Sequence, residues 1–185
     1  MTRDWLATPR RQAAIDLALA LAAATAASIG TALVAGHAVP GTPMPDWRAY
    51  ALLVLGGAVL ALRRRNPSLV LAVTATSAFL YDLLGYPGAF FTIAFVLALF
   101  SAMAARRRVQ ALAAATALFA ALVAVDLVSP RGHLLDATGA LWFVGWLVAA
   151  LVAGEVARGR ADYLAEVERR AIEAERTREE EALRR

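Results

Sequence analysis

Clusters of arginine interrupt this chain and leave long apolar stretches between them. The clusters are Arg10 and Arg11, then Arg63 to Arg65, then Arg106 to Arg108, and a mixed-charge segment, residues 158–185, closes the sequence. Because a charge is costly in hydrocarbon, such clusters mark the ends of apolar segments that cross a membrane. This alternation constrains the fold more than any single motif does.

The composition favours a helical membrane protein. Apolar residues make up 60% of the 185 residues, compared with about 45–50% in ordinary soluble domains. Since hydrocarbon contains no water to pair backbone groups, apolar segments that span it must be helices. The chain has no cysteine, which excludes disulfides and thiolate metal sites. The net charge of +4 arises before residue 156, so it indicates orientation in a membrane rather than nucleic-acid binding.

Six apolar segments are candidate transmembrane helices. A spanning helix needs about 20 apolar residues, and the first segment is too long for the apolar region of a signal peptide. The second is the shortest, because its charge-free core, residues 49–62, rises only about 21 Å against a layer of ~30 Å. Trp47, Tyr50 and Arg63 can extend it at the two interfaces. The six predicted spans are residues 13–35, 47–62, 68–84, 89–105, 109–128 and 134–154.

The positive-inside rule predicts the orientation of these spans. If all six cross and the N-terminus is cytoplasmic, the other side holds only Arg48 and Arg131. The topology-setting arginines then all lie in cytoplasmic turns: Arg63, Arg64, Arg65, Arg106, Arg107 and Arg108. We therefore expect a multi-pass membrane protein with both termini in the cytoplasm and the lipid bilayer as a partner. The outer loops are short, so a signal is expected to be sensed in the bilayer or at its outer rim.

The last segment has the pattern of a helix that dimerises. Four apolar residues repeat with spacings of 3, 4 and 3, as a and d positions of a two-stranded coiled coil do, and they are Leu164, Val167, Ala171 and Ala174. The next seam positions are Arg178 and Glu181, so the seam fades and indicates a register shift, or stutter. We expect a homodimeric coil; the alternative is a solvated helix that makes no dimer contact.

The predicted organisation is an all-α membrane protein in two parts. Residues 1–157 form a six-helix transmembrane sensor domain, and residues 158–185 form a cytoplasmic signalling helix. No proline separates the sixth span from this helix, so a movement of the span is expected to be carried over roughly 40 Å at ~1.5 Å per residue.

Ionisable residues near the membrane are candidate sensing groups. Asp82, Asp126 and His133 are predicted at the outer rim, where histidine and carboxylates bind protons or cations. Their spacing matches no metal motif, so interfacial anchoring or pairing between helices is the alternative. Asp16 is predicted near the inner interface, where it can pair with arginines. We predict no catalytic, cofactor-binding or metal-binding residue and no direct nucleic-acid contact.

Three motifs together resemble the N-terminal membrane region of bacterial, especially actinobacterial, sensor histidine kinases with a HisKA_3-type dimerisation and phosphoacceptor module. They are Ala-Leu-Arg-Arg-Arg-Asn-Pro at residues 61–67, Tyr-Asp-Leu-Leu-Gly-Tyr-Pro at residues 81–87, and the Glu/Arg-rich ending at residues 166–185. The resemblance implies a two-component input module that passes an envelope or membrane signal to a kinase core. That core would phosphorylate a response regulator, and ATP and Mg are expected only there.

The resemblance does not extend to catalysis within these 185 residues. His37 and His133 lie in predicted outer loops, and no phosphate-binding loop occurs. The chain alone is therefore not expected to be an enzyme, and we expect either a fragment or a naturally truncated module. The alternative is a small polytopic transporter or membrane scaffold with no kinase. Transport sites usually lie near the midplane, whereas the predicted charges lie near the ends of the spans, which weighs against a transporter.

Overall fold

The computed structural model describes residues 9–37, 43–88, 90–128 and 137–183, and in these ranges it contains helices and no strand. Six α-helices follow one another along the chain, and a short 3-10 helix, η2 (Leu60–Leu62), extends the second. The six are α1 (Pro9–Ala35), α2 (Trp47–Val59), α3 (Pro67–Leu83), α4 (Thr92–Ala104), α5 (Arg108–Val128) and α6 (Ala137–Leu183). The expected all-helical architecture is confirmed for this part of the chain.

Local chemistry sets several of the helix boundaries. Asp46 caps α2, because its Oδ1 accepts hydrogen bonds from two backbone N–H groups of the first turn at 3.0 and 3.2 Å. Pro67 occupies the first position of α3, where a missing N–H costs nothing. Between α3 and α4 the chain turns at Gly85 and Gly88, whose φ angles are 76° and 85°. Glycine adopts this left-handed conformation without a steric penalty.

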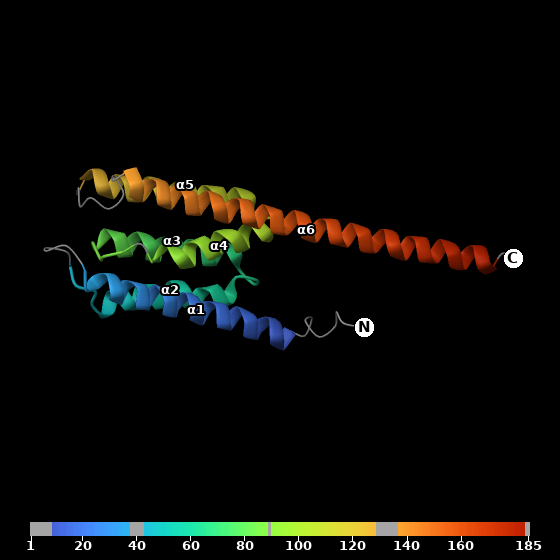
Figure 1. Ribbon diagram of the computed structural model, residues 1–185, viewed down its shortest axis with the longest axis horizontal. Helices are drawn as coiled ribbons and strands as arrows, with labels where there is room; N and C mark the ends of the chain where they lie inside the picture. The colour runs from blue at the N-terminus through green and yellow to red at the C-terminus, as the bar shows by residue number, and fades with distance from the viewer. Residues whose placement is uncertain (1–8, 38–42, 89, 129–136, 184–185) are drawn as a thin grey trace.

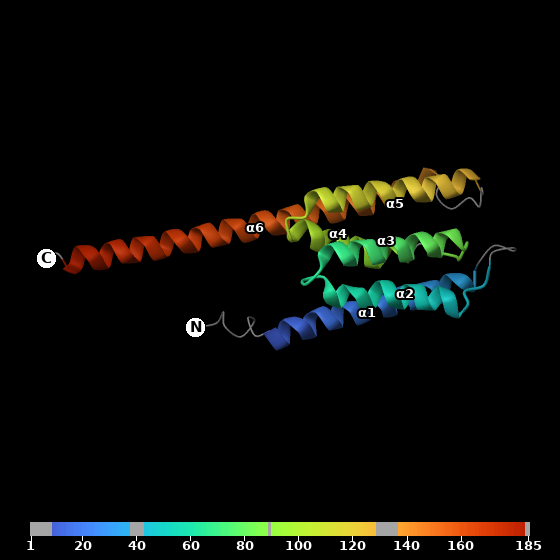
Figure 2. The ribbon, with the colours of Figure 1, turned by 180° about the vertical axis from the view of Figure 1, so that it is seen from behind.

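The helices form an up-and-down bundle in three layers. The pair α3 and α4 lies between the pair α1 and α2 and the pair α5 and α6, as both views show (Figures 1 and 2). Successive helices run in opposite directions, as the colours show (Figures 1 and 2). The beginning of α1, both triple-arginine turns and the charged end of α6 therefore lie toward one end of the molecule (Figure 1). The turn at residues 84–88 lies at the other end, which we call the outer end.

The core is built from a few large side chains among many alanines. The largest fully buried apolar side chains are Leu60, Tyr81, Phe95, Leu99 and Leu122. Small residues allow the helices to approach closely. A Cβ atom at Gly57 would lie 2.6 Å from the Cβ of Ala24, so α1 and α2 meet where α2 has no side chain.

Three of the six helices are long and apolar enough to cross a membrane by length and composition. They are α1 over Arg11–Ala35, α5 over Arg108–Val128 and α6 over Gly139–Glu180. The segments Trp47–Leu62, Pro67–Leu83 and Thr92–Ala104 form shorter apolar helices. The fourth predicted span is the most shortened, because α4 begins only at Thr92, after the turn that contains Gly88. Six helices thus occupy the six predicted segments, and three of them reach the length of a span.

α6 runs without a break through the boundary predicted at residue 157. It is 47 residues long, and its second half projects beyond the bundle (Figure 1). Every residue from Tyr163 to Glu180 is exposed. The apolar and charged parts of the C-terminal region are therefore two halves of one helix, and the helical continuity expected from the absence of proline is observed.

Close packing between α4 and α6 can be tested at Gly154. A Cβ atom there would lie 2.5 Å from the Cβ of Met103 and 2.9 Å from the carbonyl oxygen of Phe100, whereas one at Gly159 would meet nothing within 4 Å. We predict that Gly154→Ala lowers the free energy of unfolding by about 1–2 kcal/mol, since overpacking outweighs the higher helix propensity of alanine. Gly159→Ala, the control, should leave it unchanged or raise it by up to ~1 kcal/mol. Denaturant titration in detergent micelles measures the free energy of unfolding of both variants. Equal effects of the two substitutions would contradict the close packing at Gly154.

Candidate functional site

A buried carboxylate joins α1 to the first triple-arginine turn. Asp16 is only 4% exposed. Arg63 donates to its Oδ1 from Nε at 2.9 Å and from Nη2 at 2.7 Å, and Arg64 donates from Nε to its Oδ2 at 2.6 Å. Both carboxylate oxygens are therefore paired, as a buried charge requires. The pairing expected for Asp16 is present, and it connects α1 to the turn between α2 and α3.

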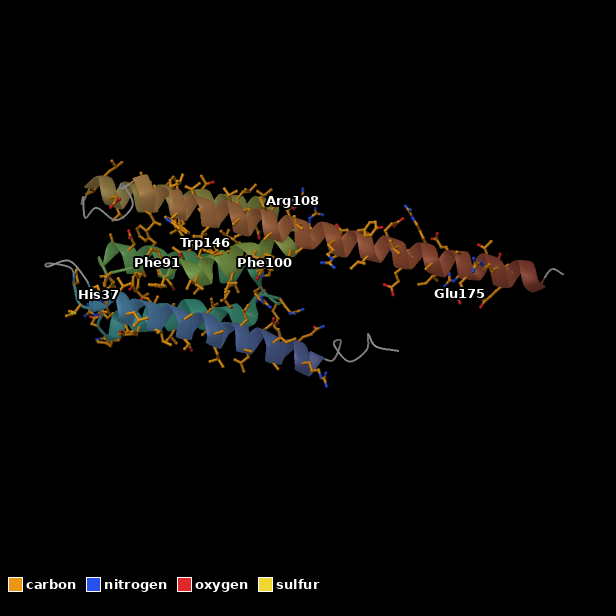
Figure 3. All side chains as sticks on the ribbon, viewed as in Figure 1. His37, Phe91, Phe100, Arg108, Trp146 and Glu175 are labelled. Atoms are coloured by element: carbon orange, nitrogen blue, oxygen red, sulfur yellow. The ribbon has the colours of Figure 1, made fainter. Side chains whose placement is uncertain are left out.

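A second ionic cluster joins α6 to the other triple-arginine turn. Arg106 donates to Asp162 at 2.5 Å, and Arg108 pairs with Glu155. Arg158 pairs with the same Glu155 and, at 2.9 Å, with Asp162. Arg108 lies where α6 leaves the bundle (Figure 3). We call these five residues the α6 ion network; it holds α6 at the point where its apolar half ends.

Pairing within the α6 ion network shifts the pKa values of Glu155 and Arg158. The hydrogen bond from Arg158, and then the charge of Arg108, lower the pKa of Glu155 below its ordinary value of 4.5. The same pairing raises the pKa of Arg158. Because a lowered carboxylate pKa stabilises the folded state only above the unfolded value, this contribution is lost as the pH falls below about 4.5. Water screens these half-exposed charges, so the network positions α6 more than it stabilises the fold.

The outer end holds a tyrosine cluster that sequence reasoning did not identify. Tyr86 donates from its hydroxyl to Oδ1 of Asp46 at 2.5 Å, and Tyr81 donates to the carbonyl oxygen of Pro87 at 2.9 Å. The Tyr81 hydroxyl also lies 3.2 Å from Oγ1 of Thr31. The two tyrosine rings lie 5.3 Å apart. The segment Tyr81 to Pro87 therefore joins α1, α2 and α3 at this end.

The hydrogen bond between Asp46 and Tyr86 shifts the pKa values of both groups. It lowers the pKa of Asp46 from its ordinary value of 3.8 and raises the pKa of Tyr86 from 10.0. The two pKa values therefore shift in opposite directions, and both shift away from neutral pH. Protonation of this pair does not provide a pH switch between pH 5 and 8.

The residues predicted to sense signals at the outer rim differ in their surroundings. Asp126 is buried near the end of α5, and Asp82 is half-buried in the last turn of α3. Both have interaction partners. His133 lies outside the described residues. Among the residues that the structure describes, no group of three His, Cys, Asp or Glu side chains is placed to hold a metal ion.

The remaining predicted residues lie on exposed surfaces. Arg65 and Arg107 are exposed in the two arginine turns. The four seam residues, Leu164, Val167, Ala171 and Ala174, are all exposed on the projecting half of α6. The sequence did not predict the ion pair between Arg106 and Asp162. Its one local signal is that Glu155 and Asp162 are seven residues apart and therefore share a helix face.

The buried pair at Asp16 can be tested by neutralising its charge. We predict that Asp16→Asn lowers the free energy of unfolding by about 3 kcal/mol, because Arg63 loses the partner of its largely buried charge. The matched control is Glu166→Gln, which removes an exposed pair with Arg170 and should cost less than ~0.5 kcal/mol. Denaturant titration in micelles distinguishes them, and a small cost at Asp16 would show that the pair does not hold α1.

Known proteins supply no identity for this chain. Comparison with family models, curated proteins and solved structures finds no match.

Proposed function

We propose that this chain is the membrane input module of a two-component sensor histidine kinase. In this proposal six helices cross the bacterial inner membrane with both termini in the cytoplasm. The observation that carries the proposal is α6, a single helix that packs within an apolar bundle and continues as an exposed charged helix. Such a helix connects a membrane-embedded body to a cytoplasmic effector without an intervening joint.

The arrangement of the arginine turns supports six spans, although α2, α3 and α4 are short. Both turns lie at the end of the bundle from which α6 projects (Figure 1). If α2 alone failed to cross, both turns would leave the cytoplasmic side, against the positive-inside rule. Short spans are accommodated by local bilayer thinning and by snorkelling side chains. Arg63 and the helix η2 extend α2 toward the interface.

The α6 ion network supplies the proposed route of the signal. A lipid state, a lipophilic compound or envelope stress shifts the packing of the bundle. Arg106, in the turn between α4 and α5, pairs with Asp162 of α6, and Arg108, the first residue of α5, pairs with Glu155 of α6. A displacement of α4 or α5 is thereby transmitted to α6 just before its projecting half. Rotation or sliding of one packed helix is a known form of switching between two states.

The projecting half of α6 is the proposed output. Two copies form a coil through the seam that contains Leu164 and Val167, and the seam changes register after Ala174. In a complete kinase the coil register would select between kinase and phosphatase states. ATP, Mg and the response regulator would bind the kinase module, and the chain described here would bind no nucleic acid.

A transporter is the second candidate from the sequence, and the described residues favour it less. In α1 to α5 the acidic residues lie near helix ends: Asp16 pairs with an arginine turn, and Asp82 and Asp126 lie in last turns. Transport sites are typically ionisable groups near the midplane.

Register selection can be tested in a chimeric kinase. Residues 1–185 would replace the input region of a characterised sensor kinase, and Ala174→Leu, Arg178→Leu and Glu181→Leu would be combined. We predict that the continued apolar seam locks one register and changes the kinase-to-phosphatase ratio about tenfold or more. The ratio is measured as phosphorylated response regulator in membranes.

The control is Arg169→Leu with Arg176→Leu, two residues on the opposite face of the same helix. This pair should leave the ratio within about twofold of the parent chimera, since f positions of a coiled coil do not enter the seam. An unchanged ratio in the triple variant would contradict the proposed function, and so would equal changes in both variants.

A further inference from the structure

The apolar half of α6 has one face that packs on the bundle. Phe143, Leu147 and Ala150 are buried there. The ring of Phe143 stacks on Phe119 of α5 with centroids 6.1 Å apart, and Gly154 lies against Met103 of α4. This face therefore fixes how α6 is rotated about its own axis relative to the bundle.

Part of the remaining surface of α6 is apolar and uncovered. A shallow groove of about 390 Å³ is lined by Leu141, Trp142, Gly145, Trp146 and Ala149, all of α6. Trp142 is 65% exposed and Trp146 is 55% exposed. The floor of the groove is open, because a Cβ atom at Gly145 would meet nothing within 4 Å. Gly145 and Ala149 are four residues apart, the spacing at which small residues let two membrane helices approach closely.

The groove and the coiled-coil seam lie on the same side of α6. An α-helix has about 3.6 residues per turn, so 18 positions correspond to five complete turns. Leu164 follows Trp146 by 18 positions, and Val167 follows Ala149 by 18 positions. Ala171 likewise follows the exposed Ala153. Because α6 is one unbroken helix, these three seam residues point in the same directions as their counterparts at the level of the bundle.

The charges beside the seam specify what can cover this face. With Leu164 and Ala171 at a positions, Arg170 is at g, and Glu168 and Glu175 are at e. Two parallel copies bring Arg170 of each chain against Glu175 of the other, an attractive g–e pairing. Antiparallel copies would instead bring acidic e positions together. The charge pattern therefore matches a second, parallel copy of the same helix.

We infer that a second copy of this chain occupies the α6 groove, so that a parallel homodimer interface runs along one face of α6 from Leu141 to Ala174. The inference rests on the proposed function, from which it takes the membrane orientation and the cytoplasmic coil. It adds a dimer contact inside the membrane. Trp146 lies at the level of the bundle and Glu175 on the projecting half, so one surface joins the two levels (Figure 3).

Disulfide formation between copies tests this interface, since the chain has no native cysteine. Gly145→Cys, Ala149→Cys and Val167→Cys would be oxidised separately in native membranes, at matched protein amounts. A disulfide requires Cα atoms within about 7 Å of each other. We predict at least tenfold more covalent dimer at these positions than at Val144→Cys. Val144, the control, adjoins Gly145 at the same depth, and it lies partly exposed away from the groove.

The outcomes separate this inference from the proposed function. If Val167→Cys forms dimers while Gly145→Cys and Ala149→Cys match the control, the groove is not an interface, yet the cytoplasmic coil remains. If none of the three exceeds Val144→Cys, the homodimer is overturned at both levels. Dimers at the membrane positions alone would support the groove and contradict the coil. The output of the chimeric kinase tests the function independently of all three results.

Discussion

Arginine side chains cannot remain unpaired in hydrocarbon, and the rest of the structure is arranged around the two turns that carry them. Both turns lie at one end of the bundle (Figure 1). Each is also paired with a distant part of the chain: Arg63 and Arg64 with Asp16 of α1, and Arg108 with Glu155 of α6. The residues that are expected to orient the chain in a membrane thus also attach its first and last helices to its centre.

The two attachments differ in strength, and this difference bears on function. Asp16 is buried and paired through both oxygens, so removing its charge is expected to destabilise α1. Glu155 and Asp162 are half-exposed, and water weakens their pairs with the arginines. Rearranging the second attachment therefore costs less free energy than rearranging the first. Under the proposed function, movement occurs at α6, where a close contact at Gly154 sets the position of the helix and an exposed face continues beyond the bundle.

Helix positions could be predicted from the sequence because turn chemistry and charge mark them locally. Pro67 and the arginine triplets fall at helix ends, as the predicted spans require. Contacts between distant segments could not be predicted, because they depend on how the helices are rotated. The bond between Asp46 and Tyr86 is one such contact. Periodicity predicts the seam of α6, but only the burial of the opposite face shows which side of the helix is uncovered.

Thiol labelling in intact cells tests the central claim most directly, namely that both arginine turns and the projecting half of α6 share the cytoplasmic side. Single cysteines at Pro43, Arg65, Arg107 and Glu175 would each be exposed to a membrane-impermeant maleimide; all four native residues are exposed. The prediction is that Pro43→Cys reacts in intact cells, whereas the other three react only after permeabilisation. Labelling of Arg65→Cys or Arg107→Cys from outside would show that the short helices do not all cross, and it would contradict the six-span orientation on which the proposed route through α6 depends.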